Sequence, residues 1–312
     1  VIILFFKTFK CFFFFFPMNK IVQYFPVLPV YEEEHKKGDL IWFLHGLGDT
    51  HHTWDELFID LKNDFRLLSI DLPGHGSSLE YFHEQSEYMD DAVGWFREIT
   101  EQVSKDLSFF LVGHSLGAEI ALRFATTFPD LVRGLILLDG GYIQNEDVAA
   151  DLSTDLKQVQ EFYKSYQFSS WESYLENEKA YYQRWSDYVQ KAAVVKMKED
   201  EDKRIISKTT LATYEAAIRS LHIYPSKEIY SEVECPILLL RSSLPESSNA
   251  MKEVAAKRLI RAASDATDQI IPNAGHNIHI DAPHEVANRI RKWIEVHKNY
   301  DRENLKRRNV WE

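Results

Sequence analysis

The chain has 312 residues, of which 45% are hydrophobic and 27% charged, and its formal net charge at pH 7 is -12. This composition is that of a globular protein, and the length suffices for one large α/β domain with an insertion. The acidic balance argues against a nucleic acid as the partner, because binding to phosphates requires clustered Lys and Arg. The two cysteines form no zinc pattern or disulfide framework, so we expect a reducing, cytoplasmic location.

Residues 1–17 read VIILFFKTFKCFFFFFP and are followed by Met18. Lys7 and Lys10 interrupt the apolar stretch and no small-residue cleavage site follows, which is unlike a signal peptide. The run is also short for a membrane span. We therefore expect residues 1–17 to be a non-native or disordered extension, with the natural start at Met18 and no stable membrane insertion. An N-terminal membrane anchor is the alternative.

The next part of the chain predicts alternating strands and helices. A short hairpin is expected over residues 21–31. A continuous apolar run, typical of a strand buried on both faces of a parallel sheet, occupies 40–44, and further strands are expected at 66–70, 109–112 and 135–138. Apolar residues recur at helical spacing between these runs, at 53–62, 89–103 and 120–125.

The alternation stops after Tyr142 and resumes near the C-terminus. Residues 143–233 are rich in aromatic side chains and predict a helical cap, whereas 236–240 and 269–271 predict strands and 251–262 predicts a helix. A last helix follows Asp281-Ala282-Pro283, with Asp281 as its expected N-cap. The fold class is therefore α/β, with a doubly wound, mostly parallel sheet. Its core is expected at residues 18–142 and 234–298, followed by a charged tail at 299–312.

The most informative motif is Gly113-His114-Ser115-Leu116-Gly117, between an apolar strand and an amphipathic helix. A serine at such a tight turn has a strained backbone, and its hydroxyl points out of the sheet. The flanking glycines remove Cβ atoms that would collide where strand and helix meet. Ser115 is therefore the candidate nucleophile, and the alternative is a plain serine in a glycine-rich turn.

A nucleophilic serine needs a base, and the loop after the last strand offers His276. Gly275 directly precedes it and lets the loop bring the imidazole over the serine. His279 is the local alternative to His276. We expect His114 to have a supporting or packing role, because its side chain points away from that of Ser115.

An oxyanion also needs hydrogen-bond donors. The backbone N–H of Leu116, at the start of the helix, is one candidate. The second is the N–H of Leu47, in the glycine-containing loop His45-Gly46-Leu47-Gly48.

Taken together, the motifs resemble those of the α/β-hydrolase family. Four occur in the family's order and spacing: the His45–Gly48 loop with Trp54, the Asp71–Ser78 loop, the Gly113–Gly117 elbow, and Gly275-His276. The resemblance covers residues 21–297. It implies an eight-stranded sheet, a cap inserted after the sixth strand, no required cofactor, ester-type hydrolysis and a structural role for Asp71.

The third member of the catalytic triad departs from the family's pattern. Relatives usually place an aspartate shortly after the seventh strand, where this chain has Pro245 followed by Glu246. The extra methylene of Glu246 would let it reach the histidine from a shifted position. Asp139, at the tip of the sixth strand, is the other candidate, since some relatives place the acid there. We favour Glu246 over Asp139.

These residues predict a serine hydrolase that cleaves a carboxylic ester or lactone of a small, partly apolar substrate through an acyl-enzyme. The aromatic cap would roof the site. Alternatives are the same fold acting on C–C or amide bonds or as a perhydrolase, or a non-catalytic binding protein that retains the pocket. The histidines form no H-E-x-x-H helix, so no metal site is expected.

Overall fold

A computed structural model describes residues 21–23, 29–32, 38–84, 87–105, 107–149 and 151–298. For the first two of these ranges only the backbone is considered. The predictions for residues 1–17, the start at Met18 and the tail at 299–312 lie outside the described residues.

The core of the fold is an eight-stranded sheet in the order β1-β2-β4-β3-β5-β6-β9-β10. The six strands from β4 to β10 pair in parallel, whereas β1 and β2 add an antiparallel edge. This confirms the predicted α/β class with a mostly parallel sheet. The strands are β1 (Ile21–Gln23), β2 (Pro29–Glu32), β3 (Leu40–Leu44), β4 (Arg66–Ile70), β5 (Phe109–His114), β6 (Val132–Leu138), β9 (Ile237–Ser242) and β10 (Ala266–Ile271).

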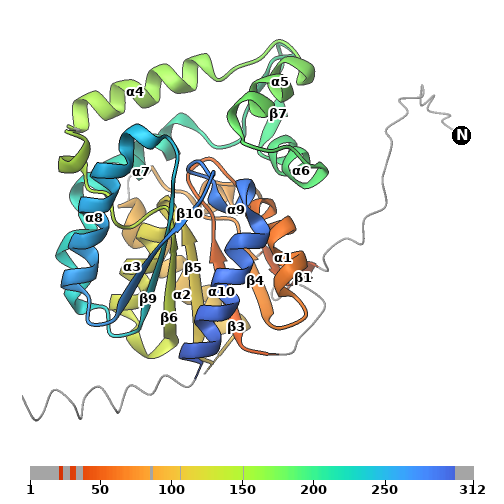
Figure 1. The fold of residues 1–312 in the computed structure, drawn as a ribbon. Helices are drawn as coiled ribbons and strands as arrows, with labels where there is room; N and C mark the ends of the chain where they lie inside the picture. The colour runs from red at the N-terminus through yellow and green to blue at the C-terminus, as the bar shows by residue number, and fades with distance from the viewer. Residues whose placement is uncertain are drawn as a thin grey trace, which may run out of the picture.

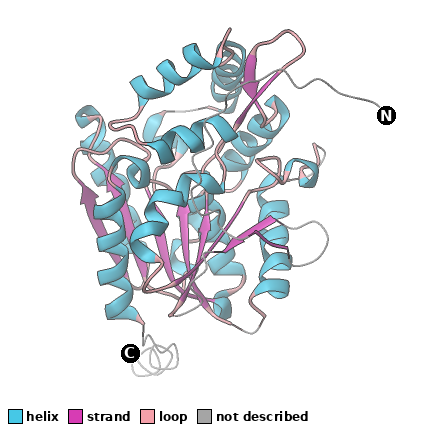
Figure 2. Ribbon diagram, turned by 90° about the vertical axis from the view of Figure 1, so that its right-hand side faces the viewer, coloured by secondary structure: helices cyan, strands magenta, loops and turns pink. Residues whose placement is uncertain are grey.

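Helices cover both faces of this sheet, as Figure 2 shows. Every residue of β3, β5 and β9 is buried, which is why most of each strand reads as an unbroken apolar run. One apolar layer joins the sheet to α2 (Tyr88–Val103), α3 (Leu116–Thr127) and α8 (Asn249–Ala262). The opposite layer joins it to α1 (Asp55–Leu61) and α10 (Pro283–His297).

The chain between β6 and β9, residues 143–233, is here called the cap segment, and Figure 1 draws it above the sheet. Its helices are α4 (Leu152–Ser165), α5 (Trp171–Tyr181), α6 (Asp187–Val195) and α7 (Leu211–Ile223). The all-helical expectation misses a small antiparallel hairpin of β7 (Met197–Glu199) and β8 (Ile205–Ser207). Tyr174 is fully buried in a separate apolar cluster of this segment.

Two further details correct the sequence analysis. The helix expected at 53–62 is divided into a 3-10 turn, His51–Trp54, and α1. Helix α10 begins at Pro283 with Ala282 as its N-cap, so Asp281 does not cap it. Among the described helices, none has the length and apolar character needed to cross a membrane.

Candidate active site

The candidate site lies where four loops leave the carboxyl ends of parallel strands. The loops follow β3, β5, β6 and β10, and the first three of these strands are neighbours in the sheet. The loop ends of a parallel sheet are the usual place for ligands in α/β proteins. The topology therefore brings together segments that are distant in the sequence.

Ser115 occupies a strained turn between β5 and α3. Its backbone angles are φ 50° and ψ -118°, outside the regions that a side-chain-bearing residue prefers. A Cβ on Gly113 would lie 2.3 Å from the carbonyl oxygen of Gly117, and a Cβ on Gly117 would lie 2.2 Å from that of Leu44. Both positions therefore require glycine, as the sequence predicts, and the turn holds Ser115 at the edge of the sheet.

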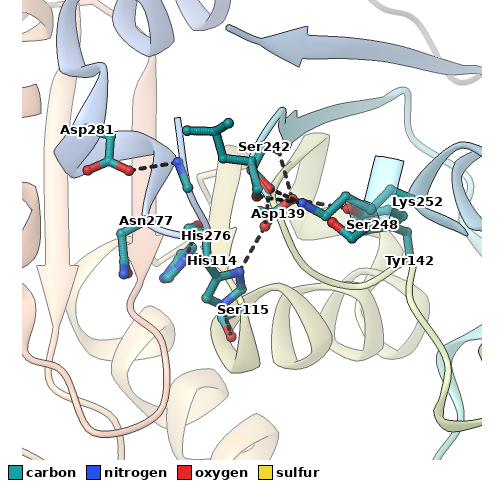
Figure 3. Close-up of polar contacts among 12 residues, drawn as sticks. His114, Ser115, Asp139, Tyr142, Ser242, Ser248, Lys252, His276, Asn277 and Asp281 are labelled. Carbon is teal, nitrogen blue, oxygen red and sulfur yellow. Dashed lines mark hydrogen bonds and ion pairs between the residues drawn. The ribbon is translucent and has the colours of Figure 1, made fainter. Parts of the chain in front are cut away.

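Ser115, His276 and Asp139 form one chain of hydrogen bonds, drawn in Figure 3. The distance from Ser115 Oγ to His276 Nε2 is 2.9 Å, and that from His276 Nδ1 to Asp139 Oδ2 is also 2.9 Å. A carboxylate can only accept, so His276 donates from Nδ1–H and its Nε2 lone pair accepts from the serine hydroxyl. This is the tautomer that a general base requires.

Asp139 is held as a buried anion. Its side chain is 3% exposed, against 45% for His276. The carboxylate accepts from the Ser242 N–H at 2.9 Å, the Ser242 hydroxyl at 2.8 Å and the Tyr142 hydroxyl at 3.0 Å. Burial raises the pKa of Asp139, but the hydrogen bond and charge of His276 and the Ser242 N–H outweigh burial and lower the pKa to about 2. The base thus faces solvent while its carboxylate partner stays ionised beneath it.

The structure does not bring Glu246 to His276, contrary to the preference drawn from the sequence. Among the described residues, Asp139 provides the carboxylate hydrogen-bonded to His276. Glu246 is exposed, in the short 3-10 helix Glu246–Ser248 that precedes α8. The physical reason lies in Ser242 at the end of β9, whose N–H and hydroxyl both bind Asp139 and fix it at the position beside the imidazole.

His114 and His279 lie beneath the base and are both buried. His114 Nε2–H donates to the carbonyl oxygen of His276 at 3.0 Å, and its ring lies 4.8 Å from the ring of His276. His279 Nε2 lies 2.7 Å from Thr53 Oγ1, so His279 is not in the position of the base. Burial lowers the pKa of both rings, that of His279 to about 3, and keeps them neutral.

Of the predicted oxyanion donors, Leu47 lies in the loop after β3, which contacts a histidine of the loop after β4, and Leu116 is the first residue of α3. Gly48 N–H donates to His75 Nε2 at 3.0 Å, and Leu72 N–H donates to His45 Nε2 at 2.9 Å, so the loops after β3 and β4 hold each other. Within the described part of the chain, neither Leu47 N–H nor Leu116 N–H has a protein acceptor.

Asp71 organises the second of these loops, as the resemblance implies. Its carboxylate accepts from the N–H groups of His51 and Ser77, each at 2.8 Å, and lies 2.9 Å from His51 Nδ1. Burial raises the pKa of Asp71, but its contacts with His51 outweigh burial and lower the pKa.

The cap segment contacts both sides of the site. A Cβ on Gly48 would lie 2.1 Å from the Tyr214 hydroxyl, so α7 rests directly on the loop after β3. On the other side, Asp281 accepts from the N–H of Gly275 at 2.8 Å and from the N–H of Gln183 in the cap segment at 3.0 Å. Asp281 therefore ties the histidine loop to the cap segment instead of capping a helix.

Sequence reasoning missed the supporting residues Tyr142, Ser242, Lys252 and Asp281. Ser242 and Lys252 carried one usable signal: the strand at 236–240 continues into polar residues, Arg241-Ser242-Ser243, just before the helix that contains Lys252. The contact of Ser242 with Asp139, and through Ser242 the link to Lys252, depends on β6 and β9 being neighbours, which no local pattern reveals.

A doubly wound sheet with a serine elbow and a facing histidine defines the hydrolases of the α/β class. The chain belongs to the alpha/beta hydrolase family, whose model matches residues 43–289. The resemblance inferred from the motifs is thus confirmed.

Individual relatives are more distant. The chain is 25% identical over 281 residues to 2-(acetamidomethylene)succinate hydrolase of Mesorhizobium japonicum, covering 84% of this chain and 90% of that protein. It is 23% identical over 265 residues to 2-succinyl-6-hydroxy-2,4-cyclohexadiene-1-carboxylate synthase of Escherichia coli, covering 81% and 93%. A crystal structure of E-2-(acetamidomethylene)succinate hydrolase aligns with a TM-score of 0.72 at 23% identity, covering 86% of this chain and 95% of that one, which supports the fold alone.

Proposed function

We propose that the protein is a serine hydrolase that cleaves a carboxylic ester or lactone of a small, partly apolar substrate through an acyl-enzyme. The observation that carries this proposal is the continuous hydrogen-bonded chain from Ser115 through His276 to Asp139. Such a chain both activates a hydroxyl and stabilises the imidazolium that forms when the proton moves.

In the proposed reaction, Ser115 Oγ attacks the substrate carbonyl while His276 Nε2 takes its proton. The N–H groups of Leu47 and Leu116 donate to the oxyanion of the tetrahedral intermediate. His276 then gives the proton to the leaving alcohol, and water, deprotonated by the same imidazole, hydrolyses the acyl-enzyme. Asp139 fixes the imidazole tautomer and stays ionised throughout.

A second candidate is cleavage of an amide-type or C–C bond in a small carboxylated substrate. It is favoured by the relatives, whose names refer to an acetamidomethylene succinate and a succinyl cyclohexadiene carboxylate. The same three side chains serve this reaction, since only the bond beside the attacked carbonyl differs. The cap segment would then select a charged substrate in place of an apolar one.

A labelling experiment tests the nucleophile, and a substrate panel tests the bond. We expect a fluorophosphonate probe to label the protein and Ser115→Ala to abolish labelling. Turnover of p-nitrophenyl esters that peaks at short or medium chain length would support the ester proposal. Turnover of 2-(acetamidomethylene)succinate without ester turnover would favour the second candidate. A folded protein with no labelling and no turnover would contradict both and favour a binding protein that retains the pocket.

The domain organisation follows from the same proposal. Residues 18–142 and 234–298 would form the catalytic core, and residues 143–233 its cap, with a small molecule as the partner and no cofactor. A cytoplasmic location is part of the proposal, and imaging of a tagged full-length chain in its host tests it.

A further inference from the structure

A buried lysine lies behind Asp139, on the far side of the carboxylate from His276 (Figure 3). Lys252, on α8, is 5% exposed. Its Nζ donates to Ser242 Oγ at 2.6 Å and to the carbonyl oxygen of Leu244 at 2.9 Å. The Ser242 hydroxyl donates in turn to Asp139 Oδ2, which is the same oxygen that accepts from His276 Nδ1. The hydrogen-bonded chain therefore extends from Ser115 to Lys252.

The charges around this hydrogen-bonded chain indicate that Lys252 is an indirect counterion of Asp139. Arg241, on β9, is already paired with Asp268 of β10 at 2.8 Å. Lys252 is thus linked to the buried anion Asp139 through the Ser242 hydroxyl. Among the described residues, the neutral rings of His114 and His279 and the Tyr142 hydroxyl are further titratable groups near His276 or Asp139. A buried ammonium is costly unless it is compensated, so its placement here calls for an explanation.

We propose that Lys252 is a positioning residue of the site: it orients Asp139 through the Ser242 hydroxyl, and its positive charge opposes protonation of His276. This inference rests on the proposed function, because it assigns His276 the role of base. An anion on one side of the imidazole favours the imidazolium, and a cation behind that anion offsets part of the effect. Asp139 consequently keeps its orientation beside His276.

The test is a pH titration of His276 by NMR on protein with carbon-13 at the histidine Cε1, with the signal assigned from His276→Asn. Lys252→Met removes the charge and retains the length of the side chain. We expect it to raise the pKa of His276 by about 1–1.5 units, the size of a Coulomb effect across three hydrogen bonds at an effective dielectric near 20. The acid limb of kcat/KM should move to higher pH by the same amount. Lys257→Met, on the exposed face of the same helix, should leave both unchanged.

A purely structural lysine would give a different result. If Lys252 only held the carbonyl of Leu244, its loss would lower stability or kcat without moving the titration of His276, and this outcome would overturn the inference.

If Lys252→Met does not fold, Ser242→Ala provides the second test. This variant removes the hydroxyl that links Lys252 to Asp139 without burying a new group. We expect the pKa of His276 to rise in this variant too, whereas Ser248→Ala, which removes a hydroxyl bonded to the Pro245 carbonyl in the same loop, should not change it. An unmoved titration in Ser242→Ala would then refute the proposal. The NMR measurement needs no substrate, so failure of the proposed function, seen as absent labelling of Ser115, remains distinguishable.

Discussion

Asp139 and Glu246 occupy opposite environments, and mutation of each distinguishes their roles. Asp139 is buried against His276, whereas Glu246 is exposed at the start of a 3-10 helix. Asp139→Asn should lower kcat by on the order of 10⁴-fold, because an amide in that position favours the wrong imidazole tautomer. Glu246→Gln should leave kcat within about twofold. Steady-state kinetics at neutral pH provide the measurement, and a larger loss in Glu246→Gln would contradict this assignment.

His114 offers a separate test at the residue scale. Its Nε2–H donates to the backbone carbonyl of His276, while its Nδ1 is buried without a partner within the described structure. His114→Phe keeps an aromatic ring and removes both ring nitrogens. We expect kcat to fall about tenfold, which corresponds to the free energy of one hydrogen bond, with KM nearly unchanged.

The melting temperature of His114→Phe should not fall, since the unpartnered nitrogen is removed as well. His297→Phe is the matched control, because His297 also donates to a backbone carbonyl, that of Trp293, away from the site. A kcat equal to that of the parent protein would show that His114 only packs.

At the scale of elements, the connection between α5 and α6 anchors the cap segment to the core. Arg184 binds Glu56 of α1 through two hydrogen bonds, at 2.6 and 2.8 Å, and donates to the carbonyl oxygen of Ile280 at 3.0 Å. Ser186 donates to the same glutamate at 2.9 Å. These contacts join the cap segment to helices that follow two of the loops of the candidate site.

Glu56→Gln should loosen this anchor without unfolding the protein. We expect faster hydrogen–deuterium exchange at residues 182–187, a KM raised by several-fold and a loss of stability of at most about 1 kcal/mol, because the pair is partly exposed. Glu285→Gln, which breaks the exposed pair with Arg289 on α10, is the control. Unchanged exchange at 182–187 in Glu56→Gln would argue against the anchor.

Elements with a strong local pattern were predictable, and contacts between elements were not. The unbroken apolar run of β3 and the glycines of the elbow specify their structures locally, through burial on two faces and through close backbone approach. The choice between Asp139 and Glu246 required the knowledge that Ser242 lies beside the end of β6. The hairpin β7–β8 was missed because strands of three residues are too short to show a period.

At the scale of the whole molecule, buried neutral histidines make stability depend on pH. Burial lowers the pKa of His75 and of His279 to about 3 from an ordinary 6.5, and lowers those of His51 and His114 as well. Between about pH 3 and 6.5 these histidines therefore bind protons in the unfolded chain but not in the folded chain. The free energy of unfolding consequently falls as the pH falls. Glu119 acts oppositely, because burial raises its pKa to about 7.

Four histidines outweigh one glutamate, so the free energy of unfolding should be larger at pH 7 than at pH 5. The expected slope below pH 6 is about 3 kcal/mol per pH unit, from a net difference of about two protons. Urea unfolding at the two pH values measures it. Glu119→Gln should widen the difference, and equal stability at pH 5 and 7 in the parent protein would contradict the account.

The residues where the chain enters and leaves the cap segment are hydrogen-bonded to each other. The Tyr230 hydroxyl, near the exit, donates to the carbonyl oxygen of Gly141 at 2.9 Å and accepts from the Gln144 side chain at 3.0 Å. Tyr142, at the entry, is bonded to Asp139. For a protein engineer this makes the segment an exchangeable module with fixed ends. A chimera that receives a foreign cap segment should keep Asp139–Gln144 and Tyr230 from this chain. A junction within these residues would displace the Asp139 carboxylate together with the cap segment.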